Sequence, residues 1–202
     1  GYYNMTAYSR SSDLVHWTFP EIITPRDRNL NHSSPGNIIR FGTQKITNWG
    51  DQSKLAIAFN DQVLLSRHRL DSLRDDCIIL LESCWQDHED EELRRMYEEA
   101  MEEMSSKNYR FFLVPIEEEA LKIVDNPSHG KNMFALGMLA EIYQRDVSII
   151  EKQIAHIFRF KSQKVVDLNI ELVKSGVAWA REHLDFQFHI PSVPAEEERI
   201  VM

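Results

Sequence analysis

Histidine, cysteine and carboxylate side chains can do acid–base, nucleophilic or metal chemistry, and in this sequence they occur without a recognisable pattern. The histidines form no HExxH pair and no HxH or Cys-His spacing typical of a metal site. Cys77 and Cys84 are too few for a structural zinc or an iron–sulfur cluster, so we expect buried or half-buried free thiols in a reducing cytoplasm. No GxGxxG or Walker A sequence occurs. The residue types therefore predict no catalytic residue, no cofactor-binding residue and no metal ligand in this chain.

One loop nevertheless combines groups that suit an anion. Ligands of parallel sheets approach the carboxyl ends of the strands, which the sequence places at Asn60 and Glu82 among others. The loop 127–132 adds backbone N–H groups, the cation Lys131 and a helix N-terminus. Asn60, Lys131 and Asn132 are therefore the candidate contacts for a substrate or a neighbouring domain. The alternative interpretation is that the loop only joins the sheet to the helices that follow.

The composition disfavours two other classes of protein. Lys and Arg number 23 against 32 Asp and Glu, a formal net charge of -9, so we do not expect a nucleic-acid-binding protein. No apolar stretch approaches the roughly 20 residues of a membrane span, and the N-terminus lacks a signal-peptide pattern. The dense acidic run 87–103 predicts either the solvated face of an amphipathic helix or a docking site for a basic partner. Because the chain begins with Gly1, we expect a fragment of something longer.

The hydrophobic pattern changes near residue 42. Before it, turn residues interrupt short strands expected at 2–8, 15–18 and 37–41, which predicts an irregular β-rich segment. After it, the run 55–59 predicts a strand buried on both faces, and Ser148 is expected to cap a helix. Further strands are expected at 77–81, where the apolar run predicts a second buried strand, and at 109–114. Helices are expected at 61–74, 90–104, 117–124, 133–143, 148–160 and 165–184. Apolar residues at helical spacing from Leu93 to Met104 form one stripe, and the nearly all-round apolar composition of 133–143 predicts a buried helix. The predicted fold class is α/β, a mostly parallel sheet followed by a helical C-terminal third.

Several segments resemble one enzyme family. They are Ile46–Asp51 (ITNWGD), Leu55–Asn60 (LAIAFN) and Gly130–Tyr143 (GKNMFALGMLAEIY), with a trailing pattern of Ile154, Phe158, Lys161, Asn169, Gly176 and Trp179-Ala180. Together they resemble the gamma domain of the 2-oxoacid:acceptor (ferredoxin) oxidoreductases, which in many bacteria is the N-terminal part of a fused alpha subunit. The 2-oxoglutarate-type enzymes are the sub-type it resembles most. The resemblance covers about residues 38–202, and Arg199–Met202 is similar to the start of a pyrimidine-type thiamine diphosphate domain.

The N-terminal end departs from this family. The glycine-rich strand–turn–helix that opens such a domain is missing, which predicts an incomplete Rossmann-like sheet with an exposed edge. Residues 8–17 and 33–42 instead resemble a β-propeller glycoside hydrolase of family 32 or 43. Three origins of such a segment stay open: a recombinant reading frame, a faulty assembly of sequence fragments or a natural fusion. Too few carboxylates are available there for glycoside hydrolysis. We therefore expect a foreign propeller-like fragment at 1–42, a truncated gamma domain at 43–189 and a linker towards a thiamine diphosphate-binding domain at 190–202.

The resemblance implies a complex that oxidatively decarboxylates a 2-oxoacid, with 2-oxoglutarate as the expected substrate, coenzyme A as acyl acceptor and ferredoxin as electron acceptor. It implies thiamine diphosphate, magnesium and iron–sulfur clusters in the complete complex and none in this chain. The expected partners are the thiamine diphosphate-binding alpha and beta parts, in the cytoplasm, and the isolated chain is expected to be an inactive supporting domain. Two other functions stay open: a non-catalytic interaction domain with an acidic docking helix, or a remnant of a carbohydrate-active glycoside hydrolase.

Overall fold

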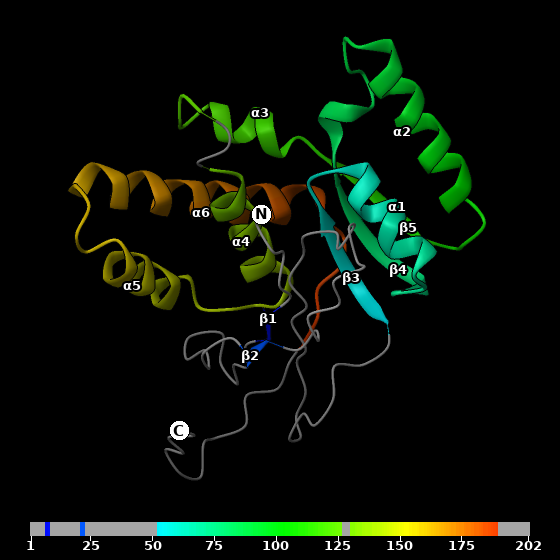
Figure 1. Ribbon diagram of the computed structural model, residues 1–202. Coiled ribbons are helices and arrows are strands. Elements are labelled where there is room, and N and C mark those ends of the chain that lie inside the picture. The colour runs from blue at the N-terminus through cyan, green and yellow to red at the C-terminus, as the bar shows by residue number, and fades with distance from the viewer. Residues whose placement is uncertain (1–6, 9–20, 23–51, 127–129, 190–202) are drawn as a thin grey trace.

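A parallel sheet forms the centre of the chain. The computed structural model describes residues 7–8, 21–22, 52–126 and 130–189 (Figure 1). Strands β3 (Ser53–Ala58), β4 (Leu73–Glu82) and β5 (Arg110–Val114) pair in the order β3-β4-β5, and both pairs are parallel. The helix α1 (Asp61–Arg69) connects β3 to β4, and α2 (Glu91–Met104) connects β4 to β5. These βαβ units confirm the predicted α/β fold class.

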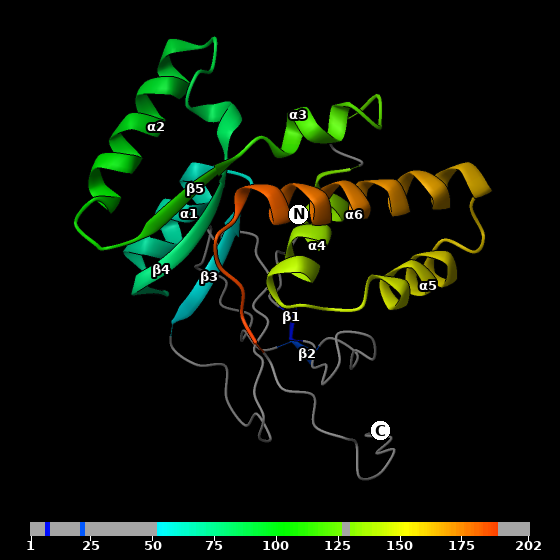
Figure 2. The same ribbon diagram turned by 180° about the vertical axis from the view of Figure 1, so that it is seen from behind.

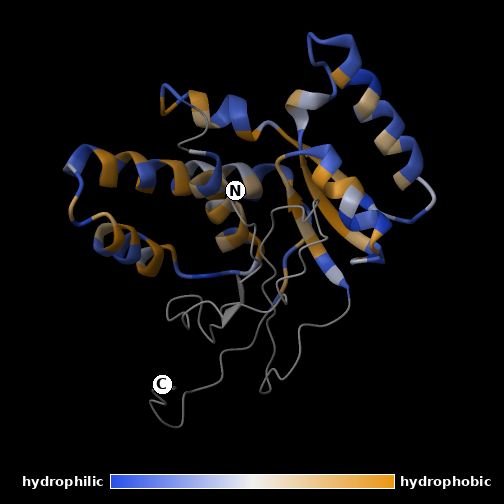
Figure 3. Cartoon of the chain, in the orientation of Figure 1, coloured by the Kyte–Doolittle hydropathy of each residue, from blue (hydrophilic) through white to orange (hydrophobic). Residues whose placement is uncertain are grey.

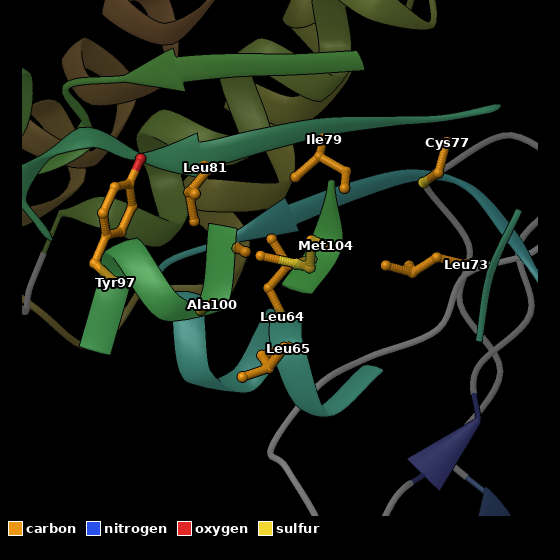
Figure 4. Close-up of a cluster of buried hydrophobic side chains, with 10 residues drawn as sticks. Leu64, Leu65, Leu73, Cys77, Ile79, Leu81, Tyr97, Ala100 and Met104 are labelled. Atoms are coloured by element: carbon orange, nitrogen blue, oxygen red, sulfur yellow. The ribbon is translucent and has the colours of Figure 1, made fainter. Parts of the chain in front are cut away.

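Helices cover both faces of this sheet. Side chains alternate along β4, and Cys77, Ile79 and Leu81 pack in one cluster with apolar residues of α1 and α2 (Figure 4). On the other face Leu80 packs with residues of α4 (Lys131–Ile142) and α6 (Gln163–His183). The central strand is therefore buried on both faces. The strand β3 packs on both faces, as predicted for 55–59, with Ala58 in the first cluster and Leu55 and Ile57 against the second. Its burial is only partial, because β3 is an edge strand of the described sheet.

The C-terminal third is helical, as predicted. It contains α4, α5 (Val147–Ile157) and α6, preceded by the short helix α3 (Ile116–Leu121), and Figures 1 and 2 show α6 packed against α4. A Cβ atom added at Gly137 would lie 2.0 Å from the carbonyl oxygen of Val173, and one at Gly176 would lie 2.0 Å from that of Phe134. The two helices therefore approach each other backbone to backbone at these glycines. Figure 3 shows apolar strands between helices with polar outer surfaces, most of all along α2.

An extended segment follows α6 and completes the core on the α4 side of the sheet. Leu184, Phe186 and Phe188 alternate along it and pack on that cluster. The ring of Phe186 lies 5.4 Å from that of Phe112 in β5, measured between centroids. The backbone N–H of Phe188 donates to the carbonyl of Ile142 at 2.7 Å. This segment thereby ties the end of α6 to both the sheet and the end of α4.

Two predicted element boundaries were wrong. The helix expected to reach residue 74 ends at Arg69, because Asp71 has a positive φ of 50° and Leu73 enters the core as the first residue of β4. Asp146, and not Ser148, caps α5, and its side chain accepts the Ser148 N–H at 2.9 Å.

Little of the N-terminal segment can be compared with its prediction. β1 (Ala7–Tyr8) and β2 (Glu21–Ile22) pair antiparallel, and β1 falls within the strand expected at 2–8. The strands expected at 15–18 and 37–41, the boundary near residue 42 and the linker 190–202 lie outside the described residues. Among the described residues no helix is both long enough and apolar enough to cross a membrane.

Candidate functional site

The carboxyl ends of β3 and β4 meet at one edge of the sheet, where ligands of parallel sheets approach. Asn60 follows β3 and caps α1: its Oδ1 accepts the N–H groups of Gln62 at 2.9 Å and Val63 at 3.1 Å. Trp85 lies in the short 3-10 helix η1 (Ser83–Trp85) after β4 and donates its indole N–H to the carbonyl of Phe59 at 2.9 Å. The Asn60 oxygen therefore stabilises a helix terminus, and its contact with a substrate stays a prediction.

Glu82, the last residue of β4, is a fully buried carboxylate at this edge. One carboxylate oxygen accepts the backbone N–H of Cys84 at 3.4 Å, and the other accepts the backbone N–H of Glu117 at 3.0 Å. These bonds compensate the burial of a polar group and join the central strand to the first turns of η1 and α3. Glu82 therefore joins the central strand to the start of α3.

Lys131, the first residue of α4, forms a charged cluster with Glu82 and Glu117. Its Nζ lies 2.5 Å from a carboxylate oxygen of Glu117 and 4.0 Å from one of Glu82. The ammonium therefore lies between two carboxylates instead of being presented alone to an anion. Asn132, the next residue, is exposed on the first turn of α4. The part of the predicted loop at 127–129 lies outside the described residues.

The electrostatics of the cluster follow from burial and from its neighbours. Burial raises the pKa of the Glu82 carboxyl, while the N–H groups of Cys84 and Glu117 and the ammonium of Lys131 act to lower it. Burial and the Glu82 and Glu117 carboxylates raise the pKa of the Cys84 thiol to about 11. The thiol is therefore protonated at neutral pH and is a poor nucleophile.

The donor atoms of Glu82, Cys84 and Glu117 lie within 4.8 Å of one another, a separation that a metal ion could bridge. Zinc accepts such a set of one sulfur and two carboxylate oxygens, but it requires the thiolate. Here the thiol has a raised pKa, and the Lys131 ammonium already lies against both carboxylates. A metal ion would therefore have to displace both the thiol proton and the Lys131 ammonium, and in the structure the cluster is an ion-paired junction between elements.

The acidic run is a surface helix. Tyr97, Ala100 and Met104 of α2 are buried against the sheet, whereas most of the acidic residues are exposed. Asp90 caps the helix, and its side chain accepts the N–H groups of Glu92 at 2.8 Å and Leu93 at 3.4 Å. The arrangement supports the interpretation of this run as an amphipathic helix with a solvated face.

Comparison of the sequence with known families decides the membership of the chain. Residues 37–179 match the family described as Pyruvate ferredoxin/flavodoxin oxidoreductase. The chain belongs to this family. All members of the cluster, and also Asn60 and Asn132, lie within the matched region of this oxidoreductase-family chain.

One solved structure with a similar fold is also a ferredoxin oxidoreductase. It is the 2-oxoglutarate:ferredoxin oxidoreductase from Magnetococcus marinus with 2-oxoglutarate, coenzyme A and succinyl-CoA bound, with a TM-score of 0.56 and 19% sequence identity. The similarity covers 74% of the chain described here and 24% of the chain in the solved structure. The present chain therefore spans about a quarter of the length of that relative. A search of curated protein sequences found no match.

Sequence reasoning did not predict the two carboxylates of the charged cluster. It singled out Lys131, but it did not name Glu82 or Glu117 as site residues. One signal could have found Glu82: a carboxylate that directly follows the apolar run Cys77–Leu81 lies where a buried strand reaches the ligand-binding edge. The expectation that Cys77 and Cys84 are buried or half-buried free thiols is confirmed.

Proposed function

We propose that this chain is a supporting domain, the gamma domain, of a 2-oxoacid:ferredoxin oxidoreductase that converts a 2-oxoacid to its acyl-CoA. The family match over residues 37–179 is the observation that carries the proposal. The fold shared with the 2-oxoglutarate:ferredoxin oxidoreductase supports it and favours 2-oxoglutarate as the substrate. In this proposal the thiamine diphosphate-binding alpha and beta parts are the partners, and ferredoxin accepts the electrons through the whole complex.

The residues of this chain do not fit the cofactors of such a complex. An iron–sulfur cluster needs several thiolates together, whereas Cys77 is buried beneath α1 and α2 and Cys84 lies in η1 with a raised pKa. A magnesium ion with a diphosphate needs accessible carboxylate oxygens, whereas those of Glu82 are buried and bonded to backbone N–H groups. We therefore assign the cofactors to the other parts of the complex, and the chain's role is to pack against them.

The test has two arms. In the first, the complete gene is expressed, and reduction of methyl viologen is measured with coenzyme A and either 2-oxoglutarate or pyruvate. Activity that requires a 2-oxoacid and coenzyme A is expected, and its absence from a folded, cofactor-loaded preparation would contradict the proposal. In the second, calorimetry of the 202-residue chain with thiamine diphosphate and magnesium should show no binding. Stoichiometric binding there would assign the cofactor to this chain.

We also propose that Asn60, Lys131 and Asn132 contact coenzyme A or the domain that holds it. Lys131→Met and Asn132→Ala should then raise the KM for coenzyme A and leave the KM for the 2-oxoacid unchanged. Lys122→Met is the matched control, since Lys122 is the C-cap residue directly after α3 and pairs with Glu119 at 2.6 Å. An unchanged KM in both site variants would remove these residues from the substrate site.

The domain organisation is a further part of the proposal. We propose residues 43–189 as the gamma domain, residues 1–42 as a foreign segment, and 190–202 as a linker. A single amplicon from source DNA through codons 30–55 tests the junction. Failure of that amplicon, with product on either side, is expected from a foreign segment, and a continuous amplicon would show that the fusion is natural.

A further inference from the structure

The connection between α5 and α6 carries an exposed apolar and basic surface. We define this α5–α6 tip by Ile157, Arg159, Phe160, Lys161 and Lys164. Residue Phe160 is 85% exposed and Ile157 is 64% exposed. The Arg159 guanidinium lies over the Phe160 ring, 4.4 Å from its centroid. Figures 1 and 2 show the tip at the end of the helical part farthest from the sheet.

The tip is basic although the whole chain is acidic. The formal net charge is -9, yet no Asp or Glu occurs between Glu151 and Asp167. Within the described part of the chain, Lys161 and Lys164 form no ion pair. The acidic helix α2 lies at the opposite end of the molecule (Figure 1). An exposed aromatic ring with an arginine over it therefore lies close in the sequence to two lysines that form no ion pair among the described residues.

This combination is typical of a protein interface. Aromatic and arginine side chains are enriched at the centres of interfaces, where they supply most of the binding energy. Charges around such a centre select a partner of opposite charge and orient it. The chain covers 24% of the solved oxidoreductase chain, so most of that chain is available as further protein surface around a domain of this fold.

We propose that the α5–α6 tip docks on an acidic surface with an apolar centre, in the part of the enzyme that lies outside this chain; the inference rests on the proposed function. Phe160 and Ile157 would fill the apolar centre, and Arg159, Lys161 and Lys164 would face carboxylates. A net charge of -9 opposes approach to a phosphate-covered membrane or nucleic acid. A protein surface with a small acidic patch avoids most of this repulsion, because its carboxylates lie opposite the basic tip and not opposite the acidic remainder of the chain.

Lysine acetylation followed by mass spectrometry tests this docking in the full-length protein. Lys161 and Lys164 should be acetylated about tenfold or more slowly in the full-length protein than in the 202-residue chain. Lys122, with a 55% exposed side chain on the C-terminal end of α3, is the internal reference. A carbodiimide should link Lys161 or Lys164 to Asp or Glu residues outside this chain.

Variants of the tip supply a second measurement. In the full-length protein, Phe160→Asp should return Lys164 to the acetylation rate of the 202-residue chain, and Lys122→Glu should not. Because Phe160 is 85% exposed, the fold should survive, which circular dichroism checks. Equal acetylation rates in the full-length protein and the chain would overturn the proposal. Protection that arises only from phosphatidylserine vesicles, or only from self-association of the 202-residue chain, would also overturn it.

The same preparations separate this inference from the proposed function. A full-length protein that reduces viologen with a 2-oxoacid but leaves Lys161 and Lys164 reactive would refute the docking and keep the function. A protein that protects both lysines but shows no 2-oxoacid-dependent activity would refute the function and keep the docking.

Discussion

The close approach of α4 and α6 gives the sharpest test of the fold. Each helix contributes one glycine, and Gly176→Ala would place a methyl group 2.0 Å from the carbonyl oxygen of Phe134. The obstructing atom is helix backbone, so a change of side-chain rotamer cannot relieve the contact. Gly137→Ala creates the same conflict with the carbonyl of Val173. Either substitution must therefore move the two helices apart.

The cost can be worked from this geometry. Ordinary contact begins at 3.4 Å, so the helices must separate locally by about 1.4 Å, which is 3.4 minus 2.0. Phe134, Met138 and Val173 lie fully buried in this region and would lose contacts. Overpacking costs about 1–3 kcal/mol and occasionally more, and the better helix propensity of Ala returns about 1 kcal/mol. Because the obstructing atom is backbone, the upper end of this range applies, and we expect a net loss of about 2 kcal/mol in the free energy of unfolding for Gly176→Ala.

Urea unfolding followed by circular dichroism measures this loss. Ser175→Ala is the matched control, because it changes the neighbouring residue of α6 without a new backbone contact. It should alter stability by about 0.5 kcal/mol or less. The double variant Gly137→Ala/Gly176→Ala should cost less than the sum of the single variants, because the first substitution already separates the helices. A Gly176→Ala protein as stable as the wild type would refute the close packing.

Three further predictions concern the carboxyl edge of the sheet and the thiols. Because burial raises the folded-state pKa of Glu82, its contribution to stability is complete below the ordinary pKa of a glutamate and is lost as pH rises through the raised value. Between the ordinary and the raised pKa, the wild type should therefore lose stability relative to Glu82→Gln, by at most about 1.4 kcal/mol per pH unit in urea titrations. A stability difference between the two proteins that does not change with pH would contradict this. Asn60→Ala removes the cap of α1 and should cost about 1 kcal/mol in thermal unfolding; a cost near zero would show that the cap is dispensable. Cys77 and Cys84 have pKa values raised to about 12 and about 11, so Ellman's reagent at pH 8 should label neither until the protein unfolds, and rapid labelling of the native protein would be evidence against this burial.

Short-range patterns in the sequence determined where most elements lie. The apolar run Cys77–Leu81 predicted the buried central strand because a strand covered on both faces has no polar positions to alternate with. The stripe from Leu93 to Met104 predicted α2 because apolar residues at helical spacing share one face. The nearly uniform apolar composition of 133–143 predicted that α4 is buried, and Phe134 and Met138 are. In each case the information lies within a few residues of the element itself.

Only the tertiary structure decided which distant residues meet. Glu82 and Lys131 are far apart in the sequence, yet β4 and α4 bring a carboxylate oxygen and the ammonium to 4.0 Å, so the lysine of the predicted anion site also has carboxylate neighbours. The two interface glycines look unremarkable in the sequence, since nothing near either one indicates that another helix backbone lies against it. The polar segment Arg74–Asp76 became part of β4 because Leu73, just before it, is buried in the core and pairs with Ser53 of β3. Steric and electrostatic contacts depend on separation in space, and folding brings together residues whose sequence neighbours say nothing of one another.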